Sequence, residues 1–72
     1  MSDRVEMYTL KTARDKAGYS QKDAARALGI TVGTLRNYEN GKTFPDANCI
    51  LKIENLYSVS YDQLIFLNHD NA

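Results

Sequence analysis

The chain has 72 residues, 43% of them hydrophobic and 25% charged, and its nine Lys and Arg balance its nine Asp and Glu. A chain this short hides only about 60% of the surface that it exposes when unfolded, so we expect a single domain over residues 1–72, with an ordered core at about residues 7–67. The composition argues against disorder. Without an apolar run long enough for a membrane-spanning helix or a secretory signal, we expect a cytoplasmic protein.

Residue types that support catalysis or metal binding are scarce. Cys49 is the only cysteine and His69 the only histidine, so we expect neither a disulfide nor a Cys/His metal site. The sequence suggests no set of nucleophile, base and orienting group, and no glycine-rich phosphate loop. We therefore expect no enzyme activity, no cofactor and no metal, and we expect Cys49 to be a small buried hydrophobic residue.

Charge is distributed unevenly along the chain. Residues 1–42 carry eight Lys and Arg against five Asp and Glu, a net charge of +3, whereas residues 43–72 have a net charge of −3. A dipolar domain turns its positive end toward a polyanion such as DNA. The same dipole would also suit an acidic protein surface.

The first three predicted elements are short helices. Residues 8–17 carry apolar side chains at the spacing of one helix face, and a glycine follows them. Ser20 is placed to cap a second helix of about nine residues that ends at Gly29. Thr31 caps a third, mostly polar helix that ends at Asn40-Gly41, where glycine suits a helix stop.

Two further helices are predicted in the second half. Pro45 suits the first turn of a fourth helix, which the apolar side chains in residues 50–57 line. Ser60 and Gln63 form an S-x-x-Q capping box, which predicts a fifth helix carrying the apolar residues between positions 64 and 67. Five short helices without a strand pattern predict a compact all-α domain.

The second and third helices carry the most informative stretch, residues 21–39. A small side chain at Ala25 lets the two helices cross closely, and Gly29 permits a sharp turn between them. Leu35 and Tyr38 then supply the shared core. Together, at this spacing, these residues predict a helix-turn-helix.

This pattern resembles the Cro/CI-type family of helix-turn-helix domains, also called XRE or lambda-repressor-like, over about residues 10–64. The matching pieces are Ser20-Gln21, Ala25, Gly29, Thr31 and Glu39-Asn40-Gly41-Lys42. The resemblance implies the five-helix lambda-repressor-like fold. It also implies that Arg14 and Glu39 form a buried, structural salt bridge between the first and third helices.

The family docks its third helix in the DNA major groove. By this resemblance, Gln21, Asn40 and Lys42 contact phosphates. The residues that face the base edges are Val32, Gly33, Thr34, Arg36 and Asn37. Asn37 would pair with adenine, and Arg36 would reach guanine or a phosphate. Lys22 and Arg26, at the same end of the domain, are further binding candidates.

Two functions follow, and the sequence leaves both open. In size and motif the chain is most similar to the short Cro-like or modulator-of-repression proteins of temperate-phage switches between lysogeny and lytic growth. The first hypothesis is a phage-type transcription regulator in a bacterial host cell that binds a near-palindromic operator as a homodimer. Val32 and Gly33, however, carry no hydrogen-bonding side chain where the family often has one. The alternative is therefore an antirepressor that pairs with a companion CI-type repressor through the surface of the second and third helices and blocks its DNA binding.

Overall fold

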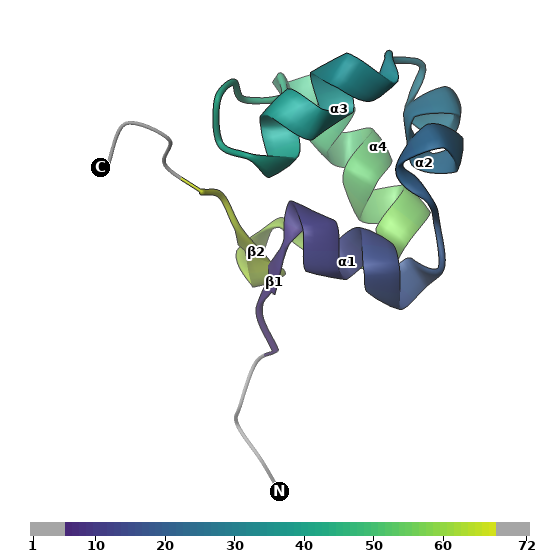
Figure 1. Cartoon of the computed structure of the whole chain (residues 1–72). Coiled ribbons are helices and arrows are strands. Elements are labelled where there is room, and N and C mark those ends of the chain that lie inside the picture. The colour runs from purple at the N-terminus through teal and green to yellow at the C-terminus, as the bar shows by residue number, and fades with distance from the viewer. Residues whose placement is uncertain (1–5, 68–72) are drawn as a thin grey trace, which may run out of the picture.

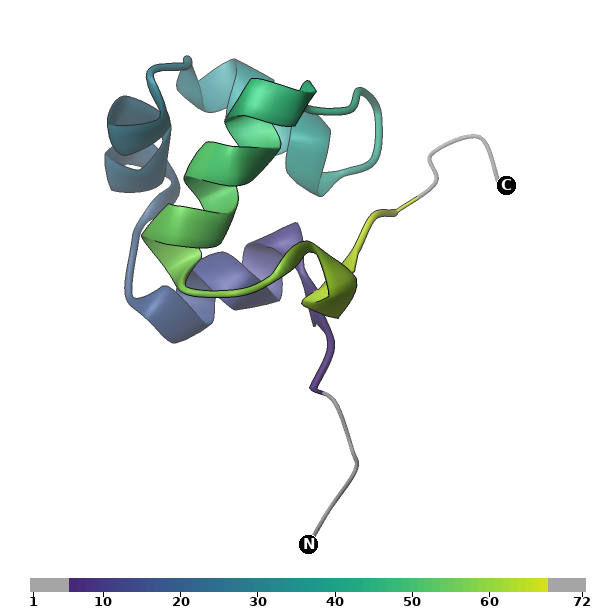
Figure 2. The same ribbon diagram turned by 180° about the vertical axis from the view of Figure 1, so that it is seen from behind.

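A computed structural model describes residues 6–67, so His69 lies outside the described residues. The elements are β1 (Tyr8–Thr9), α1 (Leu10–Ala17), α2 (Gln21–Leu28), α3 (Val32–Glu39), α4 (Ala47–Tyr57), the 3-10 helix η1 (Tyr61–Gln63) and β2 (Leu64–Ile65). In Figure 1, α3 and α2 lie above α1, with α4 behind them. Figure 2 shows α4 from the opposite side, crossing in front of the other helices.

A side chain caps the N-terminus of each α-helix. The caps are Thr9, Ser20, Thr31 and Asp46, each accepting a hydrogen bond from the backbone N–H three residues later at 2.8–3.1 Å. Each such cap contributes about 1 kcal/mol. The caps expected at Ser20 and Thr31 are confirmed. Because Thr9 caps α1 and Asp46 caps α4, α1 begins two residues later than predicted and Pro45 lies before α4 rather than in its first turn.

The predicted fifth helix is wrong, and so is the absence of strands. Gln63 Oε1 accepts from the Ser60 N–H at 3.0 Å, but this capping interaction opens only the three residues of η1. The chain then extends into β2, which pairs in parallel with β1, Leu64 opposite Tyr8. Leu64 is buried and Ile65 exposed. This alternation matches the two-residue period of a strand, so the apolar residues after Gln63 do not form one helix face.

The core lies where α1 and α2 pack against α4 and where α2 packs against α3. Leu35, Ile53 and Tyr57 are its largest fully buried side chains, and Ala25 is buried where α2 packs against α3. Tyr38, expected in the core, is only half-buried. No helix among residues 6–67 is both long and apolar enough to cross a membrane.

Candidate nucleic-acid interface

The turn between α2 and α3 depends on a left-handed glycine. Gly29 has φ +76°, a conformation that costs other residues free energy. Its N–H donates to the carbonyl of Arg26 at 3.1 Å, and the Ile30 N–H donates to the carbonyl of Ala25 at 3.0 Å. These bonds satisfy the end of α2 within two residues, so α3 begins directly after the Thr31 cap. The predicted helix-turn-helix is therefore present, with α2 and α3 packed on each other.

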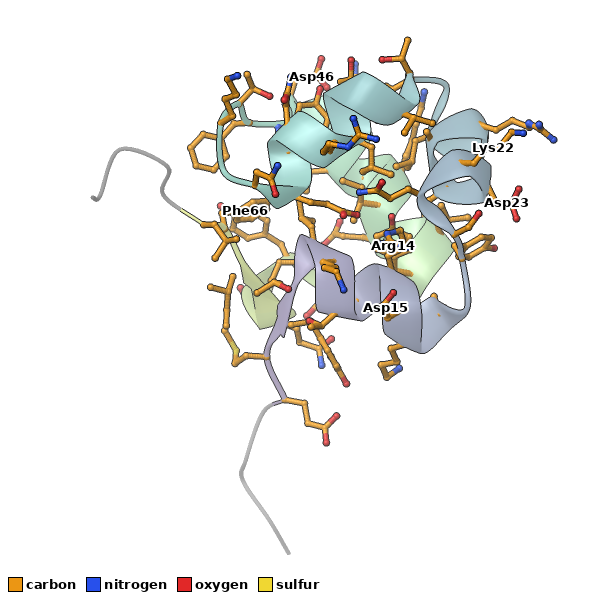
Figure 3. All side chains as sticks on the ribbon, viewed as in Figure 1. Arg14, Asp15, Lys22, Asp23, Asp46 and Phe66 are labelled. Atoms are coloured by element: carbon orange, nitrogen blue, oxygen red, sulfur yellow. The ribbon has the colours of Figure 1, made fainter. Side chains whose placement is uncertain are left out.

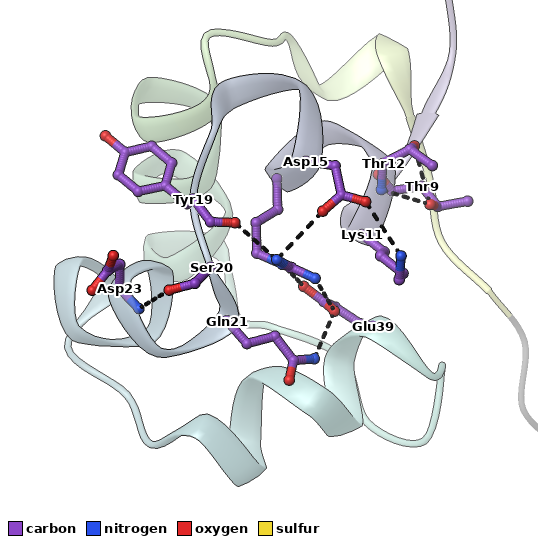
Figure 4. A network of polar contacts seen from close by, with 10 residues as sticks. Thr9, Lys11, Thr12, Asp15, Tyr19, Ser20, Gln21, Asp23 and Glu39 are labelled. Atoms are coloured by element: carbon purple, nitrogen blue, oxygen red, sulfur yellow. Dashed lines mark hydrogen bonds and ion pairs between the residues drawn. The ribbon is translucent and has the colours of Figure 1, made fainter.

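A buried polar network fixes the base of α3 (Figure 4). Arg14 Nε donates to Glu39 Oε2 at 2.7 Å, and Arg14 Nη1 donates to the carbonyl of Tyr19 at 2.8 Å. The Arg14 and Glu39 side chains are only 8% and 3% exposed. The hydrogen bond to Glu39 raises the pKa of Arg14 above its ordinary value. The salt bridge implied by the family resemblance is thus present, and it ties α1 to α3.

Gln21 belongs to this same network. Its Nε2 donates to Glu39 Oε1 at 2.9 Å, which links the first residue of α2 to the last residue of α3. A glutamine amide has two N–H donors, so one N–H remains for a phosphate contact. From the sequence, Gln21 is expected only to bind phosphate, and its internal bond to Glu39 was not predicted. The signal that could have revealed this bond is a polar residue at the start of α2 together with a buried acid at the end of α3.

The outer face of α3 is open. Leu35 and Glu39 are buried on its inner side, whereas Gly33, Arg36 and the C-cap residue Asn40 are exposed. The remaining predicted readers, Val32, Thr34 and Asn37, are half-buried. The five predicted groove-facing residues therefore lie together along one helix, although three of them are partly covered.

Two positions on this face, Thr34 and Gly33, differ in what they offer a ligand. The Thr34 hydroxyl accepts a hydrogen bond from the Thr31 hydroxyl at 2.9 Å, so it retains its own O–H as a donor. At Gly33, an added Cβ would meet only the Thr31 hydroxyl, at 3.9 Å. The backbone of α3 is therefore accessible at Gly33, and a side chain introduced there has room.

Exposed cations lie on both helices of the helix-turn-helix and in the loop after α3. Lys22 and Arg26 lie on α2, Arg36 lies on α3 and Lys42 lies in the following loop; all four are exposed, and within residues 6–67 none of them forms an ion pair. Figure 3 shows Lys22 extending from α2 into solvent, with Asp23 beside it. The one carboxylate on α3, Glu39, is already paired with Arg14. The surface of α2 and α3 is therefore positive, as a polyanion requires.

Lys52 is a further cation near this site that was not predicted from the sequence. It lies in the acidic second half of the chain, but α4 carries its Nζ to 4.0 Å from the position that a Cβ of Gly29 would occupy. The turn of the helix-turn-helix therefore has an amine nearby. No local pattern indicated this, because Lys52 and Gly29 are far apart in sequence. Residues 6–67 contain no group of three or more His, Cys, Asp or Glu that could hold a metal ion.

Comparison with known proteins agrees with this architecture. The model of a family described as helix-turn-helix matches residues 10–64. The HTH-type transcriptional regulator ImmR of Bacillus subtilis (strain 168) is 52% identical over 56 residues, covering 78% of this chain and 44% of that protein. The SPbeta prophage-derived uncharacterized HTH-type transcriptional regulator YonR of the same organism is 42% identical over 60 residues, covering 83% of this chain and 56% of that protein. The chain thus spans about half the length of these two relatives.

A shorter relative matches over most of its own length. The uncharacterized HTH-type transcriptional regulator YazB of Bacillus subtilis (strain 168) is 34% identical over 55 residues, covering 76% of this chain and 80% of that protein. The matched family region contains the whole of α1, α2, α3 and α4. The chain therefore belongs to the helix-turn-helix family of the Cro/CI, or XRE, type.

Proposed function

We propose that this protein is a transcription regulator that binds operator DNA by placing α3 in the major groove. The observation that carries the proposal is the open face of α3, which carries the exposed Arg36 and is followed by the exposed Lys42, while Arg14 neutralises the carboxylate of Glu39 internally. A surface with unpaired cations and no unpaired acid on α3 attracts phosphates. The names of the relatives, all HTH-type transcriptional regulators, support the same role.

The arrangement suggests a division of labour between backbone and base contacts. We assign phosphate contacts to Lys42 and Asn40, which are exposed just beyond α3, and to Gln21, which keeps one N–H for the same purpose. Arg36 and Asn37, on α3 itself, are the side chains suited to guanine and adenine. Phosphate contacts would then supply most of the affinity, and these two residues most of the base preference.

The biological setting that we propose is a temperate-phage switch, with two copies on a near-palindromic operator. The prophage origin in the name of one relative supports this setting. Two copies on a palindrome double a small set of base contacts, which compensates for the missing polar side chains at Val32 and Gly33.

Selection from a pool of random duplexes tests the proposal. The protein is expected to enrich one sequence and to bind it at least about a thousandfold more tightly than random DNA at physiological salt. Lys42→Ala should weaken this binding, whereas Lys11→Ala, which removes an exposed cation of α1 paired with Asp15, should not. Failure to enrich any duplex, or equal effects of the two variants, would refute DNA reading through α3.

The accessible backbone at Gly33 favours a second candidate. An antirepressor would dock this bare patch, with Val32 beside it, against a companion CI-type repressor and cover the repressor's DNA surface. Gly33→Gln separates the two candidates, because the added side chain has room on α3 but would block a close-packed partner. Under the antirepressor hypothesis, Gly33→Gln weakens binding to the repressor. Under the operator hypothesis, it leaves DNA binding unchanged or improves it.

A further inference from the structure

The strand β2 continues into residues that lie directly on the loop after α3. A Cβ added to Gly41 would lie 2.6 Å from the carbonyl oxygen of Leu67 and 2.8 Å from its carbonyl carbon. Real side chains essentially never approach a backbone this closely, so Leu67 occupies the space that only a glycine at position 41 leaves free. Figure 3 shows Phe66 beside this loop. The end of the described chain therefore packs against the point where α3 stops.

Aromatic rings make a second contact between the same two segments. The Phe66 ring lies edge-on to Phe44, with centroids 5.7 Å apart, and 5.8 Å from the ring of Tyr61. Phe44 is 66% exposed, whereas Phe66 packs against the core. The ring of Phe44, in the loop after α3, is thus held from one side by the ring of Phe66, which follows β2. At its other end the segment is anchored by buried Leu64, which pairs with β1.

The loop held in this way carries Lys42. Its own backbone bonds secure mainly its beginning, where the Lys42 N–H donates to the carbonyl of Asn37 at 2.9 Å. The next bond, from the Thr43 N–H to the same carbonyl, is longer at 3.4 Å. Leu67 contacts Gly41, which comes just before Lys42, and Phe66 contacts Phe44, which lies beyond both bonds. The segment therefore meets the loop on both sides of Lys42.

We propose that the segment of residues 64–67 is a positioning element for DNA binding, which holds Lys42 where it meets a phosphate. Phe66 and Leu67 act through the loop and do not touch the ligand. This inference rests on the proposed DNA-binding function and names residues outside the helix-turn-helix that set its affinity. Loss of the segment's contacts would release the loop while leaving α2 and α3 packed on each other.

Two substitutions remove the contacts in different ways. Phe66→Ala deletes the ring that holds Phe44 without altering the loop sequence, and Phe66→Tyr retains the ring as the conservative control. Gly41→Ala places a methyl group into Leu67, and Gly18→Ala is its matched control. Gly18 and Gly41 both have positive φ, +88° and +79°, but a Cβ on Gly18 meets nothing within 4 Å. Both alanines carry the backbone strain, and only one displaces the segment.

The first measurement is amide hydrogen exchange of the whole chain without DNA. Phe66→Ala is expected to speed exchange at Lys42 by roughly two- to tenfold, which corresponds to the loss of one aromatic contact. Gly41→Ala is also expected to speed exchange at Lys42, because its methyl group displaces Leu67. Phe66→Tyr and Gly18→Ala are expected to leave exchange at Lys42 unchanged. Unchanged exchange at Lys42 in Phe66→Ala would overturn the coupling between segment and loop, whether or not the protein binds DNA.

The second measurement is the salt dependence of binding to the duplex selected above. Phe66→Ala is expected to reduce the slope of log K against log salt by about one phosphate contact, as Lys42→Ala does, and the double variant to reduce it no further. A lower melting temperature with an unchanged slope would make the segment purely structural and refute the positioning role. If the wild type binds no duplex, the proposed function fails, and the exchange result alone decides the coupling.

Discussion

Replacing Glu39 by glutamine tests how strongly the buried ion pair stabilises the domain. The variant keeps the size of the side chain, but a neutral amide then faces Arg14 Nε, which now sits 2.7 Å from a carboxylate oxygen. Removing one partner of a buried pair costs about 3 to 5 kcal/mol. Arg14 keeps its bond to the carbonyl of Tyr19, and its Nη1 lies 3.5 Å from Asp15 Oδ1. We therefore expect a loss at the lower end of this range, about 3 kcal/mol of unfolding free energy. For a domain of this size that lowers the melting temperature by about 12 to 24 °C.

A double-mutant cycle with Arg14→Met, followed by urea unfolding, isolates the interaction. The exposed pair of Lys11 and Asp15, with side chains 64% and 52% exposed, provides the control within the same protein. We expect a coupling of about 2 kcal/mol or more for Arg14 and Glu39. For the exposed pair we expect about 0.5 kcal/mol or less. A coupling for the buried pair no larger than that of the exposed pair would refute the structural role of the network.

Three further predictions concern the core, the turn and the DNA face. Tyr57 has a buried hydroxyl without a hydrogen-bond partner among the described residues, so Tyr57→Phe should raise the free energy of unfolding by about 1 kcal/mol. Burial raises the pKa of the Tyr57 hydroxyl, so the wild-type free energy of unfolding is expected to fall as the pH rises above about 10, where the unfolded chain loses this proton more readily. Urea unfolding should show a smaller fall for Tyr57→Phe. An equal fall in both proteins would contradict this. Gly29→Val should cost about 1 to 2 kcal/mol because φ is +76° there, and Gly29→Asn should cost less in thermal unfolding. In titrations against selected and random DNA, Lys42→Ala should weaken both alike, whereas Asn37→Ala should lose about 1 to 3 kcal/mol of preference at one base pair; equal losses on both DNAs for Asn37→Ala would exclude base reading.

Local sequence determined where α2 begins and ends and where α3 begins. The caps Ser20 and Thr31 and the glycine at position 29 act within a few residues of themselves, through hydrogen bonds and backbone conformation. Such short-range effects can be derived from spacing alone. The resemblance to a known family added the pairing of Arg14 with Glu39, which lie 25 residues apart.

Tertiary contacts decided what the local pattern could not. The capping box at Ser60 fits the first turn of a helix, yet β2 forms because β1, from the other end of the chain, offers it a partner and the core accepts Leu64. Gln21 bonds to Glu39 and Lys52 reaches the turn only because the packed helices bring them there. A pattern read along the chain reports the bonds that a segment makes with itself. The competing bonds to distant segments exist only once the helices have packed.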